Sequence, residues 1–127
     1  MRTVSTKRAP EAIGPYSQAV VVGDIIFTSG VIPIVPETGA IAGASVEDQA
    51  RQALTNLKNL IEDSGSSMEC VVKTTVFLSD MADFKRVNDV YAAFFTGHLP
   101  ARSCVEVARL PRDVKIEIEA VALIPRR

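Results

Sequence analysis

The C-terminal segment from Val114 to Ile124 constrains the fold more than any other part of the chain. Successive side chains of a β-strand point to opposite faces of a sheet, so alternate residues share a face. One face of this segment is apolar throughout: Val114, Ile116, Ile118, Ala120, Ala122 and Ile124. The other face begins with Lys115, Glu117 and Glu119 and ends with Val121 and Leu123. The pattern predicts a strand in a sheet that carries apolar area on both faces.

The N-terminal half predicts a hairpin, a loop and a helix. Residues 19–29 contain two β-branched runs separated by Gly23-Asp24, a pair typical of a tight hairpin turn. Prolines and glycines are dense over residues 31–43, which predicts an irregular surface loop. Ser45 and Asp48 then match a capping box, and an apolar stripe at helical spacing continues to Ile61.

The C-terminal half predicts a strand, a second helix and two more strands. The run Cys70–Leu78 is β-branched and apolar on both faces apart from Lys73, as in a central strand. A helical period covers Asp83–Gly97, and Arg102–Ala108 forms a strand before the last one. The order ββαβαββ predicts the α+β class, with one mixed β-sheet and two helices packed on one face.

The composition indicates that the second face of this sheet is also covered. A chain of 127 residues has the size of one domain, and we expect a single domain over residues 1–127. Hydrophobic residues make up 47% of the chain, which is high for a small soluble monomer. Two helices cover only one face, so the sheet is expected to pack against copies of itself as an obligate oligomer.

Charge and cysteine content exclude several classes of function. A net charge of −1 gives no field that would draw in nucleic acid or an anionic membrane. Cys70 and Cys104 stand far apart and form no CxxC pair, which is typical of reduced thiols in the cytoplasm. The chain has one histidine, His98, so no metal site is predicted. No apolar run is long enough to span a membrane.

Arg102 is the strongest candidate for a functional residue. It shares a strand face with Cys104 and Glu106, and its charge needs a partner. A hairpin through residues 110–113 would set Glu117 or Glu119 opposite Cys104, and the sequence does not choose between these registers. An Arg-Glu pair that only stabilises the hairpin is one interpretation. In the other, the guanidinium grips a small carboxylate ligand while a glutamate deprotonates a water, which makes a hydrolytic site.

Other polar residues are candidates with structural alternatives. Tyr16 follows a proline in a turn and either lies over a pocket or simply packs. Ser29-Gly30 ends a strand where a ligand can approach the backbone, although a plain turn explains it equally. Asn88 lies on the apolar stripe of the second helix, where a satisfied core amide is the usual explanation. A nucleophilic Cys104 thiol would need a neighbouring imidazole or helix N-terminus, which the sequence does not provide.

Four motifs resemble the RidA/YjgF family of reactive-intermediate deaminases, and the resemblance covers essentially the whole chain. They are Ala12-Ile-Gly-Pro-Tyr-Ser-Gln18, Thr28-Ser-Gly30, Pro100-Ala-Arg-Ser-Cys-Val-Glu-Val107 and Ile116-Glu-Ile-Glu-Ala120. The resemblance implies a chorismate-mutase-like α+β fold, assembled as a homotrimer with a central barrel and three ligand clefts between subunits. It also implies hydrolysis of 2-imino acids, formed from enamines such as 2-aminoacrylate, to 2-keto acids and ammonia without a cofactor.

The resemblance assigns roles to particular residues. It implies that Arg102 binds the substrate carboxylate, and that Glu117, rather than Glu119, activates the water with help from the main-chain carbonyl of Cys104. Tyr16 would cover the cleft, and a further set would line it: Ser29, Gly30 and Asn88. Some relatives are described as endoribonucleases or translation inhibitors, so RNA cleavage is an alternative. A non-catalytic module that binds 2-keto acids in the same cleft is another.

Overall fold

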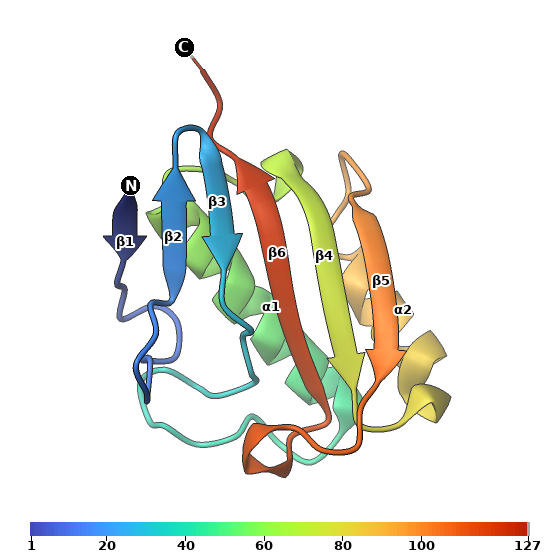
Figure 1. Cartoon of the computed structure of the whole chain (residues 1–127). Coiled ribbons are helices and arrows are strands. Elements are labelled where there is room, and N and C mark those ends of the chain that lie inside the picture. Colours follow the sequence, from blue (N-terminus) through green and yellow to red (C-terminus); the bar gives the residue numbers. More distant parts are fainter. Residues whose placement is uncertain (127) are drawn as a thin grey trace.

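The computed structural model describes residues 1–126 as one six-stranded sheet with two helices on one of its faces (Figure 1). The sheet order is β1-β2-β3-β6-β4-β5. The strands are β1 (Arg2–Val4), β2 (Ala19–Val22), β3 (Ile25–Thr28), β4 (Val71–Leu78), β5 (Ala101–Glu106) and β6 (Ile116–Leu123). The helices are α1 (Val46–Asp63) and α2 (Phe84–Ala92), and three short 3-10 turns connect elements at Met68–Cys70, Met81–Asp83 and Pro111–Asp113. The α+β class, the mixed sheet and the one-sided helices are confirmed.

Local chemistry turns the first hairpin and starts helix α1 where the sequence predicted. The β2–β3 hairpin turns at Gly23, whose φ of 58° lies in the left-handed region that glycine tolerates. The Ser45 side chain accepts a hydrogen bond from the Asp48 N–H at 3.1 Å, which caps α1. The second helix is shorter than predicted, because α2 ends at Ala92 and Phe95 enters the core from the turn that follows.

The predicted hairpin between the last two strands is wrong. Strand β4 lies between β5 and β6, pairing in parallel with β5 and antiparallel with β6 (Figure 1). Parallel neighbours need a crossover connection, and α2 supplies it between β4 and β5. Strand β6 then enters between β3 and β4, where the sheet can bury both its edges. No register choice along residues 110–113 therefore sets Glu117 or Glu119 opposite Cys104.

The core lies between the helices and the sheet. Helix α1 contributes an apolar stripe that packs against alternate residues of β3, β4 and β6. On β6 these are the residues that the sequence assigned to the apolar face. These side chains are fully buried: Ile26, Leu54, Leu57, Leu60, Ile61, Val76, Leu78, Ile116 and Ile118. The two helices on one side of the sheet thus give the chain a single continuous core.

The opposite face of the sheet carries no helix in the part of the chain that the structure describes (Figure 1). Large apolar side chains nevertheless lie exposed on it, one or more from each of five strands. They are Val22, Ile25, Phe27, Val72, Val105 and Leu123. We refer to this surface as the open face. An apolar surface spread over most of a sheet is typical of an interaction site rather than of a free monomer surface.

Replacing Leu57 by Ala tests the core. Leu57 is 0% exposed between α1 and the sheet, so Leu57→Ala should lower the free energy of unfolding by about 3 kcal/mol through lost burial and a residual cavity. Urea unfolding measures the change. Leu99 is 73% exposed, and Leu99→Ala should change the same quantity by less than about 0.5 kcal/mol. Equal effects at the two positions would contradict the described core.

Candidate active site

Arg102 lies on the helix side of the edge strand β5, where α2 holds its guanidinium. Nη1 donates a hydrogen bond to Oδ1 of Asn88 at 2.7 Å. The guanidinium carbon lies 4.8 Å from the ring centroid of Tyr91 and 5.3 Å from that of Phe84. Both distances are within the range of cation–π attraction. Asn88 and two aromatic rings therefore fix the direction of the guanidinium.

No carboxylate lies within 4.0 Å of the Arg102 guanidinium among residues 1–126. Five other arginines in this range do have such a partner: Arg8, Arg51, Arg86, Arg109 and Arg126. The interpretation of Arg102 as one half of an Arg-Glu pair that stabilises a hairpin is therefore wrong. A guanidinium that is oriented but lacks a carboxylate partner can accept an anionic ligand in a forked geometry.

The platform beneath Arg102 is rigid. The Tyr91 hydroxyl and Thr74 Oγ1 share a buried hydrogen bond of 2.7 Å, and the ring centroids of Tyr91 and Phe95 are 4.6 Å apart. Burial raises the pKa of the Tyr91 phenol above its usual value, an effect larger than the opposing ones of Thr74 and Arg102. Tyr91 therefore stays protonated at neutral pH and acts as a neutral support.

Cys104 shares the helix-side face of β5 with Arg102 and is half-buried. Burial raises the pKa of its thiol above the usual value, although the Arg102 charge partly opposes the shift. The nucleophilic form of a cysteine is the thiolate, and a raised pKa makes this form scarcer at neutral pH. The site therefore does not favour covalent catalysis by the Cys104 thiol.

Glu117 occupies the open face of β6, beside Gly30. The segment after β3 runs along β6, where the Val31 N–H donates to the Ile118 carbonyl at 2.7 Å. A Cβ atom added to Gly30 would lie 1.8 Å from Oε2 of Glu117. The sequence indicated that Gly30 leaves room for a ligand near the backbone, and in the structure that room holds the Glu117 carboxylate. Glycine is needed here for space and not for a left-handed backbone.

The Glu117 carboxyl has the properties of a proton carrier. It is half-buried, and burial raises its pKa above the usual value, with the negative charge of Glu119 adding to the shift. No Lys, Arg or His nitrogen of residues 1–126 lies within 4.0 Å of its oxygens. A carboxyl group with a raised pKa exchanges protons more readily near neutral pH than an ordinary glutamate does.

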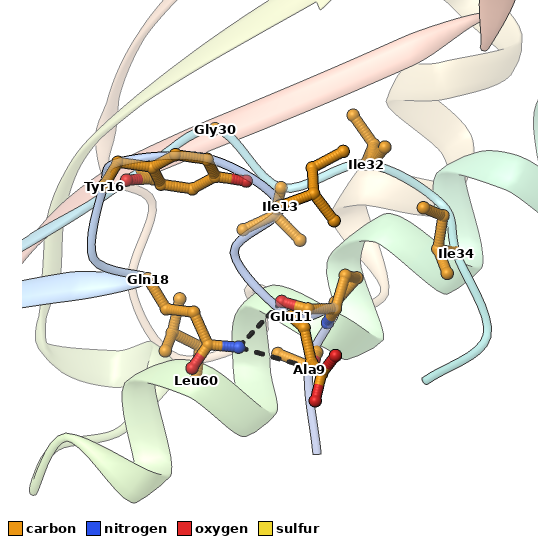
Figure 2. A pocket seen from close by; sticks show the side chains of 12 residues that line it. Ala9, Glu11, Ile13, Tyr16, Gln18, Gly30, Ile32, Ile34 and Leu60 are labelled. Atoms are coloured by element: carbon orange, nitrogen blue, oxygen red, sulfur yellow. Dashed lines mark hydrogen bonds between the residues drawn. The ribbon is translucent and has the colours of Figure 1, made fainter. Parts of the chain in front are cut away.

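Tyr16, Ser29 and Gly30 line one pocket, together with apolar side chains such as Ile13 and Ile32 (Figure 2). Tyr16, which lines this pocket, is 49% exposed. The hydroxyl of Ser29 is not free, because it donates to the Ser17 carbonyl at 2.6 Å. The structure thus brings Tyr16, Ser29 and Gly30 together, and Gly30 links them to Glu117.

The candidate residues form two half-sites within one chain. Thr74 of β4 pairs with Arg102 of β5 on one side and with Ala120 of β6 on the other. Two strand spacings, roughly 10 Å, therefore separate β5 from β6. Arg102 also points to the helix side, whereas Glu117 points to the open face. One half-site contains Arg102, Asn88 and Cys104, and the other contains Tyr16, Ser29, Gly30 and Glu117. A single protomer therefore does not bring the two charged groups together.

The aromatic platform under Arg102 was not predicted from the sequence. Phe84 and Tyr91 share the helical stripe with Asn88, so the spacing already placed all three on one face of α2. The sequence did not show that Arg102 lies against that face, because its position depends on the parallel pairing of β4 and β5. Among residues 1–126, no helix combines the length and the hydrophobicity that spanning a lipid bilayer requires.

Comparison with known proteins identifies the family. Residues 6–124 match the model of the family described as Endoribonuclease L-PSP. A 2-iminobutanoate/2-iminopropanoate deaminase of Salmonella typhimurium is 56% identical, over 96% of this chain and 97% of that protein. The crystal structure of the YjgF gene product of Escherichia coli superposes with a TM-score of 0.93 at 55% identity, covering both chains fully. Escherichia coli TdcF with bound serine gives a TM-score of 0.93 at 49% identity, over 97% of this chain and 98% of that one.

The chain therefore belongs to the RidA/YjgF family, which the four sequence motifs had predicted. The two helices and the mixed six-stranded sheet are those of its structural neighbours.

Substituting Gly30 tests the contact with Glu117. Gly30→Ala should push the carboxylate out of its half-buried position, so that the pKa of Glu117 falls toward its ordinary value. A carboxyl NMR titration measures that pKa. The matched control is Gly97→Ala, whose new Cβ would lie 3.3 Å from Oε1 of Glu69 and far from the site. An unchanged Glu117 pKa in Gly30→Ala would contradict the described contact.

Proposed function

We propose that this protein is a cofactor-independent hydrolase that converts 2-imino acids to 2-keto acids and ammonia. The observation that carries the proposal is the Arg102 guanidinium, which Asn88 and two rings orient although no carboxylate pairs with it. The carboxylate of a 2-imino acid is the kind of anion that this fork fits. Relatives named as imine deaminases, and a relative that holds serine, an amino acid with the same carboxylate, support this substrate class.

The proposed active unit is a homotrimer whose sheets form a central barrel. The apolar open face gives each protomer a surface to bury against the others. Arg102 and Glu117 lie on opposite sides of the sheet, so the cleft is complete only where the Arg102 half-site of one protomer meets the Glu117 half-site of the next. Three such clefts would form in a closed trimer.

In the proposed mechanism Arg102 holds the carboxylate and sets the imine carbon beside a water on Glu117. Glu117 takes a proton from the water as the water oxygen attacks C2, and the protonated carboxyl then passes this proton to the imine nitrogen. The resulting carbinolamine then loses ammonia and leaves the 2-keto acid. An imine carbon is already electrophilic, so orientation and proton transfer suffice. The main-chain carbonyl of Cys104 would help to hold the water, while Tyr16 covers the cleft.

Two other functions, RNA cleavage and the binding of 2-keto acids without turnover, make different demands on the same residues. An endoribonuclease would need phosphate contacts, and five arginines of residues 1–126 are already held by carboxylates. A binding module would take up 2-keto acids without turnover.

We place the activity in the cytoplasm, where Cys70 and Cys104 would remain the free thiols seen in the structure.

Removing the Arg102 charge should abolish most of the activity. Arg102→Ala is expected to lower kcat/KM by about 30- to 1,000-fold, as loss of a desolvated charge-assisted contact does, in an assay coupled to an enzyme that releases the imine. Arg102→Lys should recover only part of the lost kcat/KM, because an ammonium cannot form two parallel hydrogen bonds with a carboxylate. The control is Arg86→Ala, since Arg86 pairs with Glu47 and lies outside both half-sites. Unchanged turnover in Arg102→Ala would exclude the proposed role.

The dependence of kcat/KM on pH should report Glu117. The base form of this carboxyl is the active one, so the rate should rise with pH through a pKa above the ordinary glutamate value. Burial is the larger cause of the raised pKa, and the Glu119 charge adds to it. Glu119→Gln removes that charge, so the acidic limb should move to lower pH. Glu69→Gln, remote from the site, is the control. A limb that stays in place in Glu119→Gln would show that another group titrates.

A further inference from the structure

The segment from Glu11 to Tyr16 has almost no packing of its own. Glu11, Ile13, Gly14, Pro15 and Tyr16 are all exposed. Within residues 1–126, the Tyr16 hydroxyl forms no hydrogen bond. The position of the Tyr16 ring therefore depends on whatever ties the two ends of this segment, which we call the Tyr16 loop.

Gln18 makes that tie. Its side chain is buried, and its Nε2 donates to the carbonyls of Pro10 at 2.7 Å, Thr6 at 3.0 Å and Ala9 at 3.4 Å. Its Oε1 accepts from the Thr6 N–H at 2.6 Å. Figure 2 shows the amide reaching across the base of the loop to the irregular segment that precedes it. One side chain thus joins Pro10, directly before the loop, to Gln18, the second residue after it.

A second pair of contacts fixes the same end of the loop to the pocket. The Ser29 N–H donates to the Gln18 carbonyl at 2.9 Å, and the Ser29 hydroxyl donates to the Ser17 carbonyl at 2.6 Å. Ser29 precedes Gly30, against which the Glu117 carboxylate lies. Ser29 therefore fixes the end of the loop that contains Gln18 relative to the half-site that holds Glu117.

We propose that Gln18 is a positioning residue, which closes the Tyr16 loop through Pro10 and so holds the Tyr16 ring over the pocket beside Gly30. A buried amide that satisfies several backbone groups at once costs much to lose, because each orphaned group must find water or move. The surrounding loop is exposed, so it can move without unfolding the core. This inference rests on the proposed function in one respect, namely that Tyr16 covers the bound substrate.

The variants to measure are Gln18→Glu and Gln18→Asn. The first places carboxylate oxygens against three carbonyls, and the second keeps a neutral amide that is one methylene too short. Each should raise KM by about tenfold with a smaller change in kcat, as removal of uniform binding does. Combining either with Tyr16→Ala should give the KM of Tyr16→Ala alone, because residues that act through one another are not additive. Additive effects would overturn the proposal.

A spectroscopic readout separates this proposal from the proposed function. The chain has no tryptophan, so Tyr16→Trp gives a single reporter on the loop. Iodide should quench its fluorescence more strongly when Gln18→Glu or Gln18→Asn is added. Equal quenching would overturn the positioning role, whatever the activity. A wild-type protein without imine hydrolysis would remove the proposed function and leave the quenching test intact.

Gln49 supplies the matched control. It is also a buried glutamine whose amide bonds backbone groups, donating to the Gly43 carbonyl and accepting from the Lys115 N–H. It does not bond the Tyr16 loop. Gln49→Glu should lower thermal stability by an amount comparable to Gln18→Glu, with KM and reporter quenching unchanged. A rise in KM in both variants would indicate a general structural effect and would contradict the proposal.

Discussion

Alternation of side chains along a strand is the constraint on which the rest of this structure depends. It places Ile116 and Ile118 against the helices and Glu117 on the open face, so burial of the core determines where the carboxylate points. The same rule sends Arg102 to the helix side of β5. Core packing and site geometry are therefore consequences of one register, and a slip of one residue would exchange the two faces.

The two half-sites use different physical means to keep a charge available. Arg102 is held by an amide oxygen and two aromatic faces, which orient a cation without neutralising it. Glu117 is held by partial burial beside a glycine, which raises its pKa and leaves it without a cationic partner among residues 1–126. Charges kept unpaired in this way are costly to stability, and we attribute their retention to the ligand and water that they would bind together.

Much of this arrangement could be predicted from the sequence because it is local. The capping of α1 by Ser45, the β2–β3 hairpin and the alternating faces of β6 all follow from neighbours a few residues apart. The insertion of β6 between β3 and β4 could not be predicted, because strand order depends on contacts between distant segments. The aromatic platform under Arg102 and the fit of Gly30 to Glu117 depend on that order. The choice of Glu117 over Glu119 came from the family resemblance and stays a prediction.

The central claim is that Arg102 and Glu117 act together only across a boundary between protomers. Mixing two inactive variants, Arg102→Ala and Glu117→Gln, after reversible dissociation tests it most directly. Random hybrids of the proposed trimer should recover about a quarter of the wild-type activity, because each cleft then draws its two halves independently from the two chains. Hybrid assemblies that form, as seen by native mass spectrometry, yet stay inactive would contradict the account.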